Sequence, residues 1–125
     1  MTFERIRNLI GTWRLVATHA VDERGRPVGA PYGPIPQGIA VFGVDGRMMA
    51  VLADGRTALP AGAAAREYNS YCGNFTFDGD SLITQVDGSS NAAWIGGEQV
   101  RTARFDGERL ILQNGRRTLT WERVA

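Results

Sequence analysis

The chain has 125 residues, a net charge of +1 and 43% hydrophobic residues, a composition typical of a globular protein rather than a disordered one. This length predicts one domain over residues 1–125, because two separate cores would each be too small. Arginines and acidic residues are interspersed and form no basic face, which excludes nucleic acid as an expected partner.

The sequence indicates a cytoplasmic protein. Cys72 is the only cysteine, so no disulfide can form within the chain, and we interpret it as a small buried residue. The N-terminus carries no signal-like segment. No apolar run approaches the roughly 20 residues that span a bilayer, so we expect no membrane as a partner.

The first predicted element is a short helix over residues 2–9. Apolar residues recur there at helical spacing, and Thr2 is a suitable N-cap. Residues 61–67 are predicted to form a second short helix, introduced by Pro60.

The rest of the chain alternates between short apolar runs and turn residues, which indicates β-strands. Asp-Gly or Asn-Gly pairs favour type I′ hairpin turns, because such turns need positive φ at both central residues. These pairs begin at Asp45, Asp54, Asp78, Asp87, Asp106 and Asn114. Eight strands are predicted, over residues 12–21, 37–44, 47–52, 70–77, 81–86, 98–105, 109–113 and 117–124.

These strands predict an all-β fold, an eight-stranded antiparallel up-and-down β-barrel with a short N-terminal helix. Closing the sheet hides its edges, and eight strands leave an interior that fits side chains or one small ligand. Three connections are long, over residues 22–36, 53–69 and 89–97, and they join alternate strand pairs. We therefore expect them to gather at one open end, the mouth, with Trp13 at the opposite end, the base.

The segment Gly11-Thr12-Trp13, at the start of the first strand, resembles the G-x-W signature of the lipocalin and calycin barrels. In that superfamily the tryptophan closes the base and a basic residue of the last strand covers it, and Arg123 is the counterpart here. The chain also resembles the bacterial lipocalin-like domain family over nearly its whole length. The matching segments are residues 9–16, 38–48, 68–77, 94–101 and 106–110.

This resemblance implies a barrel with an internal pocket for a small, largely apolar molecule. It implies no known reaction. Family members often carry one or two histidines in the strand where this chain has Thr84 and Gln85. Chemistry through those imidazoles is therefore not implied.

If Trp13 points into the barrel, strand alternation also turns Leu15, Ala17 and His19 inward. His19 is the only histidine, and near the mouth it is a candidate acid–base catalyst and ligand contact. The alternative is a histidine at the strand end that is solvated or hydrogen-bonded.

The same alternation places Arg101 and Gln99 of the sixth predicted strand inward. A guanidinium inside a barrel needs an anionic or carbonyl partner, because burying it unpaired is costly. Arg101 is thus a candidate ligand contact and catalytic anion stabiliser, facing a ligand carboxylate or phenolate. Alternatively it pairs with Asp87 or Glu98, or caps the rim.

The other candidate ligand-binding residues are large side chains, most of them in or beside the long loops. Tyrosines suit the wall of a small-molecule pocket, and a tryptophan beside two glycines is placed to act as a lid. Ordinary core packing is the alternative explanation for each tyrosine, and gap filling is the alternative for the methionine. These candidates are Tyr32, Met48, Tyr68, Tyr71 and Trp94.

Two functions from different classes fit these features. One is a module that binds a small hydrophobic molecule in its internal cavity. The other is a cofactor-independent isomerase, cyclase or lyase acting on a small carbonyl or polyketide-like substrate, with His19 as acid or base and Arg101 or a tyrosine as stabiliser. A barrel filled by its own side chains, working through its surface, is a third outcome. Metal-site and phosphate-loop patterns do not occur, so we expect neither metal nor cofactor.

Overall fold

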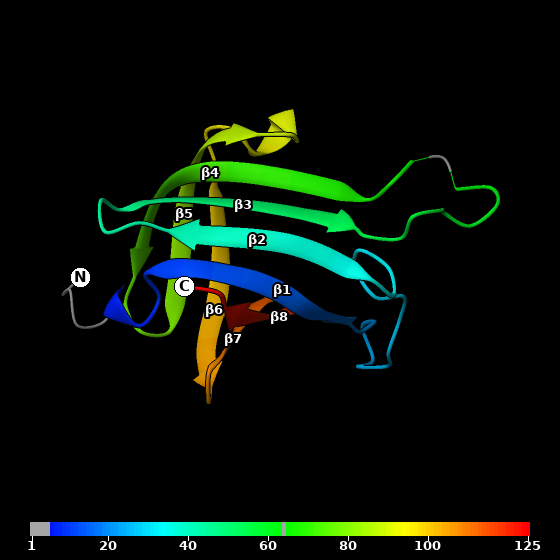
Figure 1. The fold of residues 1–125 in the computed structure, drawn as a ribbon, viewed down its shortest axis with the longest axis horizontal. Helices are drawn as coiled ribbons and strands as arrows, with labels where there is room; N and C mark the ends of the chain where they lie inside the picture. The colour runs from blue at the N-terminus through cyan, green and yellow to red at the C-terminus, as the bar shows by residue number, and fades with distance from the viewer. Residues whose placement is uncertain (1–5, 64) are drawn as a thin grey trace.

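The chain forms a closed barrel of eight antiparallel strands in sequence order, which confirms the predicted architecture (Figure 1). The computed structural model describes residues 6–63 and 65–125. A short 3-10 helix, η1 (Ala92–Trp94), lies between the fifth and sixth strands. The strands are β1 (Gly11–Ala20), β2 (Pro36–Phe42), β3 (Arg47–Asp54), β4 (Tyr68–Phe77), β5 (Ser81–Ser89), β6 (Glu98–Asp106), β7 (Arg109–Asn114) and β8 (Arg117–Arg123).

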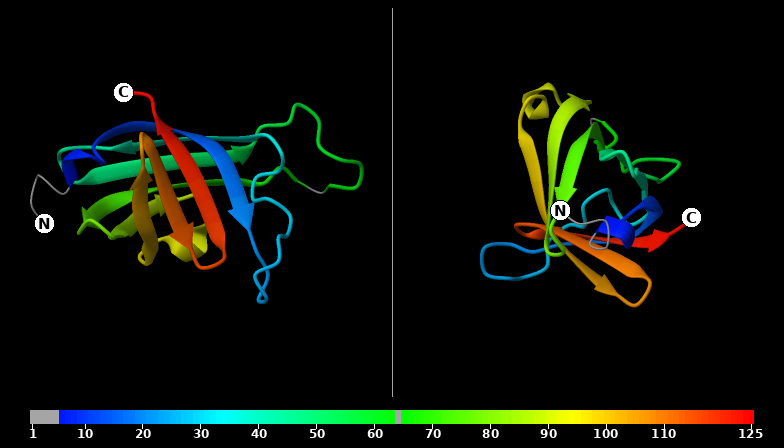
Figure 2. Two further views of the ribbon diagram at one scale, coloured as in Figure 1. Left: turned by 90° about the horizontal axis from the view of Figure 1, so that it is seen from below. Right: turned by 90° about the vertical axis from the view of Figure 1, so that its left-hand side faces the viewer.

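The last strand, β8, lies beside β1 and closes the barrel (Figure 2). Their antiparallel pairing runs from Trp13 opposite Arg123 to Ala20 opposite Arg117. Each strand therefore has two hydrogen-bonded neighbours, and the sheet presents no free edge for pairing with another chain.

Neither of the two predicted helices is seen over its predicted length among the described residues. Half of residues 2–9 falls outside the described residues; of the remainder, Ile6 and Arg7 are helical, and the Ile10 amide donates to the Ile6 carbonyl at 3.0 Å. Within 61–67, residues 61–62 form a turn and 65–67 are not helical, while residue 64 is not described. Gly62, with a φ of 87°, explains this correction, because a left-handed residue ends a helix. No helix among the described residues is long and apolar enough to cross a bilayer.

Four Asp-Gly or Asn-Gly pairs form tight hairpins at the predicted places, but not as type I′ turns. Gly46, Gly79, Gly107 and Gly115 have positive φ, whereas the residues before them do not. In the β2–β3 hairpin the Gly46 amide donates to the Gly43 carbonyl at 3.1 Å. A type I turn followed by one left-handed glycine makes this connection, so only the glycine needs the unusual conformation.

The Asp87-Gly88 pair remains inside a strand, which corrects the expectation that it forms a turn. The strand β5 continues to Ser89 through a bulge against β4. Gly73 of β4 allows this bulge, because a Cβ there would lie only 1.9 Å from the Gln85 carbonyl oxygen. The extra residue of a bulge is accommodated without ending the strand.

Trp13 closes the base of the barrel, and Arg123 covers it as predicted. Trp13 is only 1% exposed, and its Nε1 donates to the Leu9 carbonyl at 2.9 Å. The Arg123 guanidinium lies 4.3 Å from the centroid of the Trp13 ring, a cation–π contact. It also donates to the carbonyls of Ile10, at 2.7 Å, and Asn8. These hydrogen bonds hold the segment before β1 across the base.

The long connections leave from the end of the barrel opposite Trp13. Residues 21–35, 55–63 and 65–67 project beyond the strands, to the right in Figure 1. Residues 90–97 and the β7–β8 hairpin belong to the same end, because connections alternate between the two ends of an up-and-down barrel. Between mouth and base the interior is filled by core side chains, including Leu15, Phe42, Met48, Phe75, Phe77, Leu82 and Leu110.

Candidate functional site

Two adjoining cavities lie at the mouth end of the interior, and we refer to them together as the mouth cavity. The outer one encloses about 100 Å³ and the inner one about 40 Å³. Asn114 and Arg117 line only the outer cavity, whereas Leu52, Tyr71 and Trp121 line only the inner one. Six residues line both: Tyr32, Asn69, Trp94, Arg101, Leu112 and Leu119.

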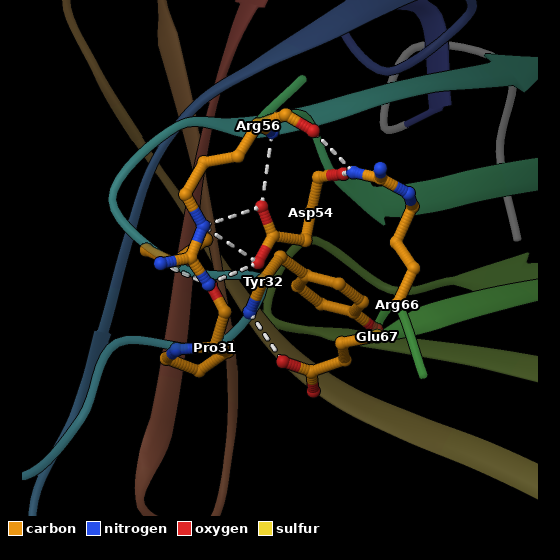
Figure 3. Close-up of polar contacts among 7 residues, drawn as sticks. Pro31, Tyr32, Asp54, Arg56, Arg66 and Glu67 are labelled. Atoms are coloured by element: carbon orange, nitrogen blue, oxygen red, sulfur yellow. Dashed lines mark hydrogen bonds and ion pairs between the residues drawn. The ribbon is translucent and has the colours of Figure 1, made fainter. Parts of the chain in front are cut away.

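Tyr32 forms one wall of this cavity in a strained backbone conformation. Its φ is 63°, and it is the one non-glycine residue with positive φ in the part of the chain described. The Gly33 amide donates to the Ala30 carbonyl at 3.1 Å, so Tyr32 occupies a turn position that favours glycine. Its amide donates to the Glu67 carboxylate at 2.6 Å (Figure 3), and its hydroxyl accepts from Asn69 Nδ2 at 2.9 Å. Burial, the largest effect, raises the pKa of the Tyr32 hydroxyl, which stays neutral.

An ion pair between Asp54 and Arg56 supports the turn that carries Tyr32. The Asp54 carboxylate accepts from Arg56 Nη2 at 2.6 Å and from its Nε at 3.1 Å (Figure 3). These bonds hold the pKa of Asp54 below its usual value. Arg66 Nη1 donates to the carbonyls of Asp54, at 2.7 Å, and Arg56, at 2.5 Å. A side chain at Gly33 would lie 2.6 Å from Asp54 Oδ2, so glycine lets the β1–β2 loop pack against this pair.

Asp54→Asn is expected to destabilise the fold at neutral pH and much less in acid. Because the folded-state pKa is lowered, the ion pair stabilises the fold above the unfolded-state value of 3.8. This stabilisation is lost as the pH falls below that value through the folded-state pKa. Urea unfolding at about pH 7 and about pH 3 measures the difference between wild type and variant.

The matched control is Asp87→Asn. Asp87 pairs with Arg47 Nη1 at 2.5 Å, but its side chain is 54% exposed, whereas that of Asp54 is 5% exposed. An exposed ion pair contributes little to the stability of the fold. Asp87→Asn should therefore lower the free energy of unfolding at neutral pH less than Asp54→Asn does. An effect of Asp54→Asn that is equal at both pH values would contradict the assigned role of the ion pair.

Arg101 points into the barrel, as its place in β6 predicts. It is half-buried and lines both parts of the mouth cavity. Its Nη2 donates to Gln99 Oε1 at 2.9 Å and its Nη1 to the Val100 carbonyl at 3.0 Å. The two acidic residues considered as its partners are engaged elsewhere: Asp87 pairs with Arg47, and Glu98 accepts from Gln85. No carboxylate of the described residues forms an ion pair with Arg101.

Tyr71 and Trp94 form an aromatic pair at the inner cavity. Their ring centroids lie 5.8 Å apart at an interplanar angle of 80°, an edge-to-face arrangement. Trp94 belongs to η1, and Tyr71 comes from β4. Burial, its largest effect, raises the pKa of Tyr71, although nearby Arg101 opposes this shift. The phenol therefore stays neutral and able to donate a hydrogen bond.

Sequence reasoning missed Arg117 and Trp121 as lining residues. Arg117 Nη1 lies 3.6 Å from the Glu67 carboxylate across the mouth. Trp121 is 2% exposed, and its Nε1 has no hydrogen-bond acceptor among the residues the structure describes. Strand alternation offered a usable signal, because an inward Trp121 also turns Leu119 and Arg117 inward.

His19 does not face the interior, which corrects the predicted orientation. A bulge in β1 between Leu15 and Ala17 shifts the alternation, and His19 is exposed on the outer face. Beyond the bulge, Thr18 points toward the mouth instead, and its hydroxyl donates to the Pro31 carbonyl at 2.6 Å. His19 therefore does not share a cavity with Arg101, and the ground for its catalytic and ligand-binding assignments is removed.

The remaining candidates fall outside the cavity lining. Met48 is 4% exposed and belongs to the core, which agrees with gap filling. Tyr68 is 50% exposed. Gln99 is half-buried and holds Arg101 by a hydrogen bond. Of the predicted ligand-binding residues, Tyr32, Tyr71, Trp94 and Arg101 are brought together.

The described residues contain no group of three or more His, Cys, Asp or Glu side chains placed to hold a metal ion. The groups that line the mouth cavity are aromatic rings, leucines, asparagine amides and two guanidinium groups. This arrangement is suited to enclosing a small molecule and to contacting its polar end.

A family model for the lipocalin-like domain matches residues 10–124. A lipocalin-like protein from Bacteroides uniformis has 14% identity and a TM-score of 0.57, over 93% of this chain and 98% of that chain. An uncharacterized protein from Bacteroides eggerthii has 12% identity and a TM-score of 0.52, over 91% and 98%. Both likenesses concern the fold alone. The curated proteins include no match to the chain.

Proposed function

We propose that this chain, which belongs to the lipocalin-like domain family, binds a small, largely hydrophobic molecule in its mouth cavity. The single observation that carries this proposal is that the mouth cavity stays open while the interior between it and the base is packed. Enclosed sites lined by apolar and aromatic side chains with a few polar groups are typical of small-molecule binding.

The walls of the cavity favour a ligand with an apolar body. Leu52, Leu112 and Leu119 form its aliphatic side, and the edge-to-face pair of Tyr71 and Trp94 forms its aromatic side. Ligand-binding cavities usually enclose roughly 300–1,000 Å³. The smaller volume here, about 100 Å³ and about 40 Å³ in its two parts, favours a compact ligand.

The alternative of a cofactor-independent enzyme is less well supported. It relied on His19 as the acid or base, and His19 is exposed on the outer face of β1. Among the described residues that line the mouth cavity, none is His, Asp, Glu or Cys. Apart from the two arginines, the titratable lining groups are Tyr32 and Tyr71, whose raised pKa values make them poor bases.

Leu112→Phe tests the binding proposal by filling the cavity. The wild-type protein is titrated with small neutral molecules (benzamide, cyclohexanol and 2-heptanone), and binding is followed through NMR shifts of residues that line the cavity. We expect at least one to bind, and Leu112→Phe to weaken that binding by roughly tenfold or more, because the new ring occupies the ligand's space.

The matched control is Ile111→Phe, the same kind of enlargement at the next position of β7, on the outer face. It should leave ligand affinity unchanged. If none of the three molecules shifts the cavity resonances, or if both variants bind as the wild type does, the proposed function is wrong.

A further inference from the structure

We propose that the mouth cavity recognises a carboxylate, with Arg101 as the group that binds it. This inference rests on the proposed function and deepens it, because it assigns a charge to the ligand's polar end. The compound class is a small organic acid with a compact apolar body.

The charged side chains that line the cavity all have one sign. Its lining includes two cations, Arg101 and Arg117, and no acidic residue among those described. Arg117 already lies 3.6 Å from the Glu67 carboxylate. Arg101 is therefore the lining cation that has no anionic partner among the described residues.

The hydrogen bonds of Arg101 leave capacity for a ligand. Its hydrogen-bond acceptors among the described residues, Gln99 Oε1 and the Val100 carbonyl, are both neutral. A guanidinium carries five N–H donors, and its planar fork matches the two oxygens of a carboxylate. A half-buried cation without a counter-charge is unfavourable, and an anionic ligand would relieve this cost.

A second donor, on a residue that lines the inner cavity, points to the same ligand chemistry. The indole nitrogen of Trp121 is buried and has no acceptor among the described residues. An indole nitrogen can only donate a hydrogen bond. The Trp121 N–H therefore needs an acceptor other than the described residues, and a bound ligand could supply one. Trp121 lines the inner cavity with Arg101 and Tyr71, whose neutral hydroxyl is also a possible donor. One carboxylate has about four lone-pair sites, enough to accept from these groups together.

The inner cavity favours a carboxylate over a phosphate. It encloses about 40 Å³, and one unpaired arginine faces it. Phosphate sites usually combine several cations or backbone amides around a larger, more highly charged group. The aromatic and leucine walls are also better matched to an organic acid than to a strongly hydrated inorganic anion.

The test compares benzoate with benzamide, a neutral molecule of nearly the same shape. Dissociation constants are measured by NMR titration at low ionic strength for wild type, Arg101→Gln and Arg104→Gln. Arg104 is the matched control, since it lies on the exposed outer face of the same strand. Wild type should bind benzoate about tenfold to a hundredfold more tightly than benzamide, the range expected for a charge-assisted bond.

Arg101→Gln should abolish this preference, and Arg104→Gln should keep it. Benzoate should also shift the indole N–H signal of Trp121, assigned by its absence in Trp121→Phe. If benzamide binds as well as benzoate, or Arg101→Gln keeps the preference, the carboxylate proposal fails while the proposed function stands. If neither compound binds and the neutral panel also fails, both are overturned.

Discussion

Trp13→Ala is expected to lower the free energy of unfolding by about 3–5 kcal/mol, the usual cost of truncating a buried large aromatic side chain. The ring is 1% exposed, and its loss would open a cavity at the base between the Arg123 guanidinium and the Phe105 ring, whose centroid lies 6.2 Å away. The Leu9 carbonyl would also lose its donor. Urea unfolding followed by circular dichroism measures this loss.

Trp13→Phe separates packing from hydrogen bonding at the base. It keeps a ring under Arg123 but removes the donor to Leu9, so we expect a loss of about 1–2 kcal/mol. Because the base lies at the far end from the mouth cavity, folded Trp13→Phe should bind ligands as the wild type does. A loss below about 1 kcal/mol in Trp13→Ala would mean that this residue does not hold the base closed.

Tyr32→Ala is expected to cost about 3–4 kcal/mol, and Tyr32→Gly about 1 kcal/mol less than that. Both variants lose a ring that is 4% exposed and the hydrogen bond from Asn69. Alanine also retains the strain of a φ of 63°, whereas glycine adopts this conformation freely. Glycine should therefore be the more stable replacement, the reverse of the usual order.

The same two substitutions at Tyr68 provide the control. Tyr68 begins β4, is 50% exposed and has no positive φ. There alanine should be more stable than glycine by roughly 0.5–1 kcal/mol, because glycine loses more backbone entropy on folding. If alanine is also the better replacement at Tyr32, the backbone of the β1–β2 loop is not strained at this position.

The barrel could be predicted because its signals are local. Alternating apolar residues mark the strands, and glycines at Gly46, Gly79, Gly107 and Gly115 mark the hairpins. The same reasoning placed the long connections at one end and Trp13 at the other. The turn type was wrong because it depends on the length of each loop, which residue pairs alone do not specify.

The candidate site was predicted in part, and the physical reason is strand register. Alternation held through β6, which has no bulge, so Arg101 and Gln99 were placed correctly. It failed in β1, where the bulge after Leu15 depends on pairing with β8 at the other end of the chain. The prediction that His19 points inward was wrong for this reason. The same alternation, applied to β8, could have predicted that Arg117 and Trp121 point inward.

The seam between β1 and β8 has a consequence for how the barrel folds. Arg14 and Glu122 pair across it at 3.3 Å, although 108 residues separate them along the chain. During synthesis, β1 emerges before the other strands but has no partner on one side until the last strand, β8, is made. Contacts of such long range bring a high entropic cost of loop closure, so folding on the millisecond-to-second scale is expected. Until the seam forms, both β1 and β7 present an open edge to other chains in the cell.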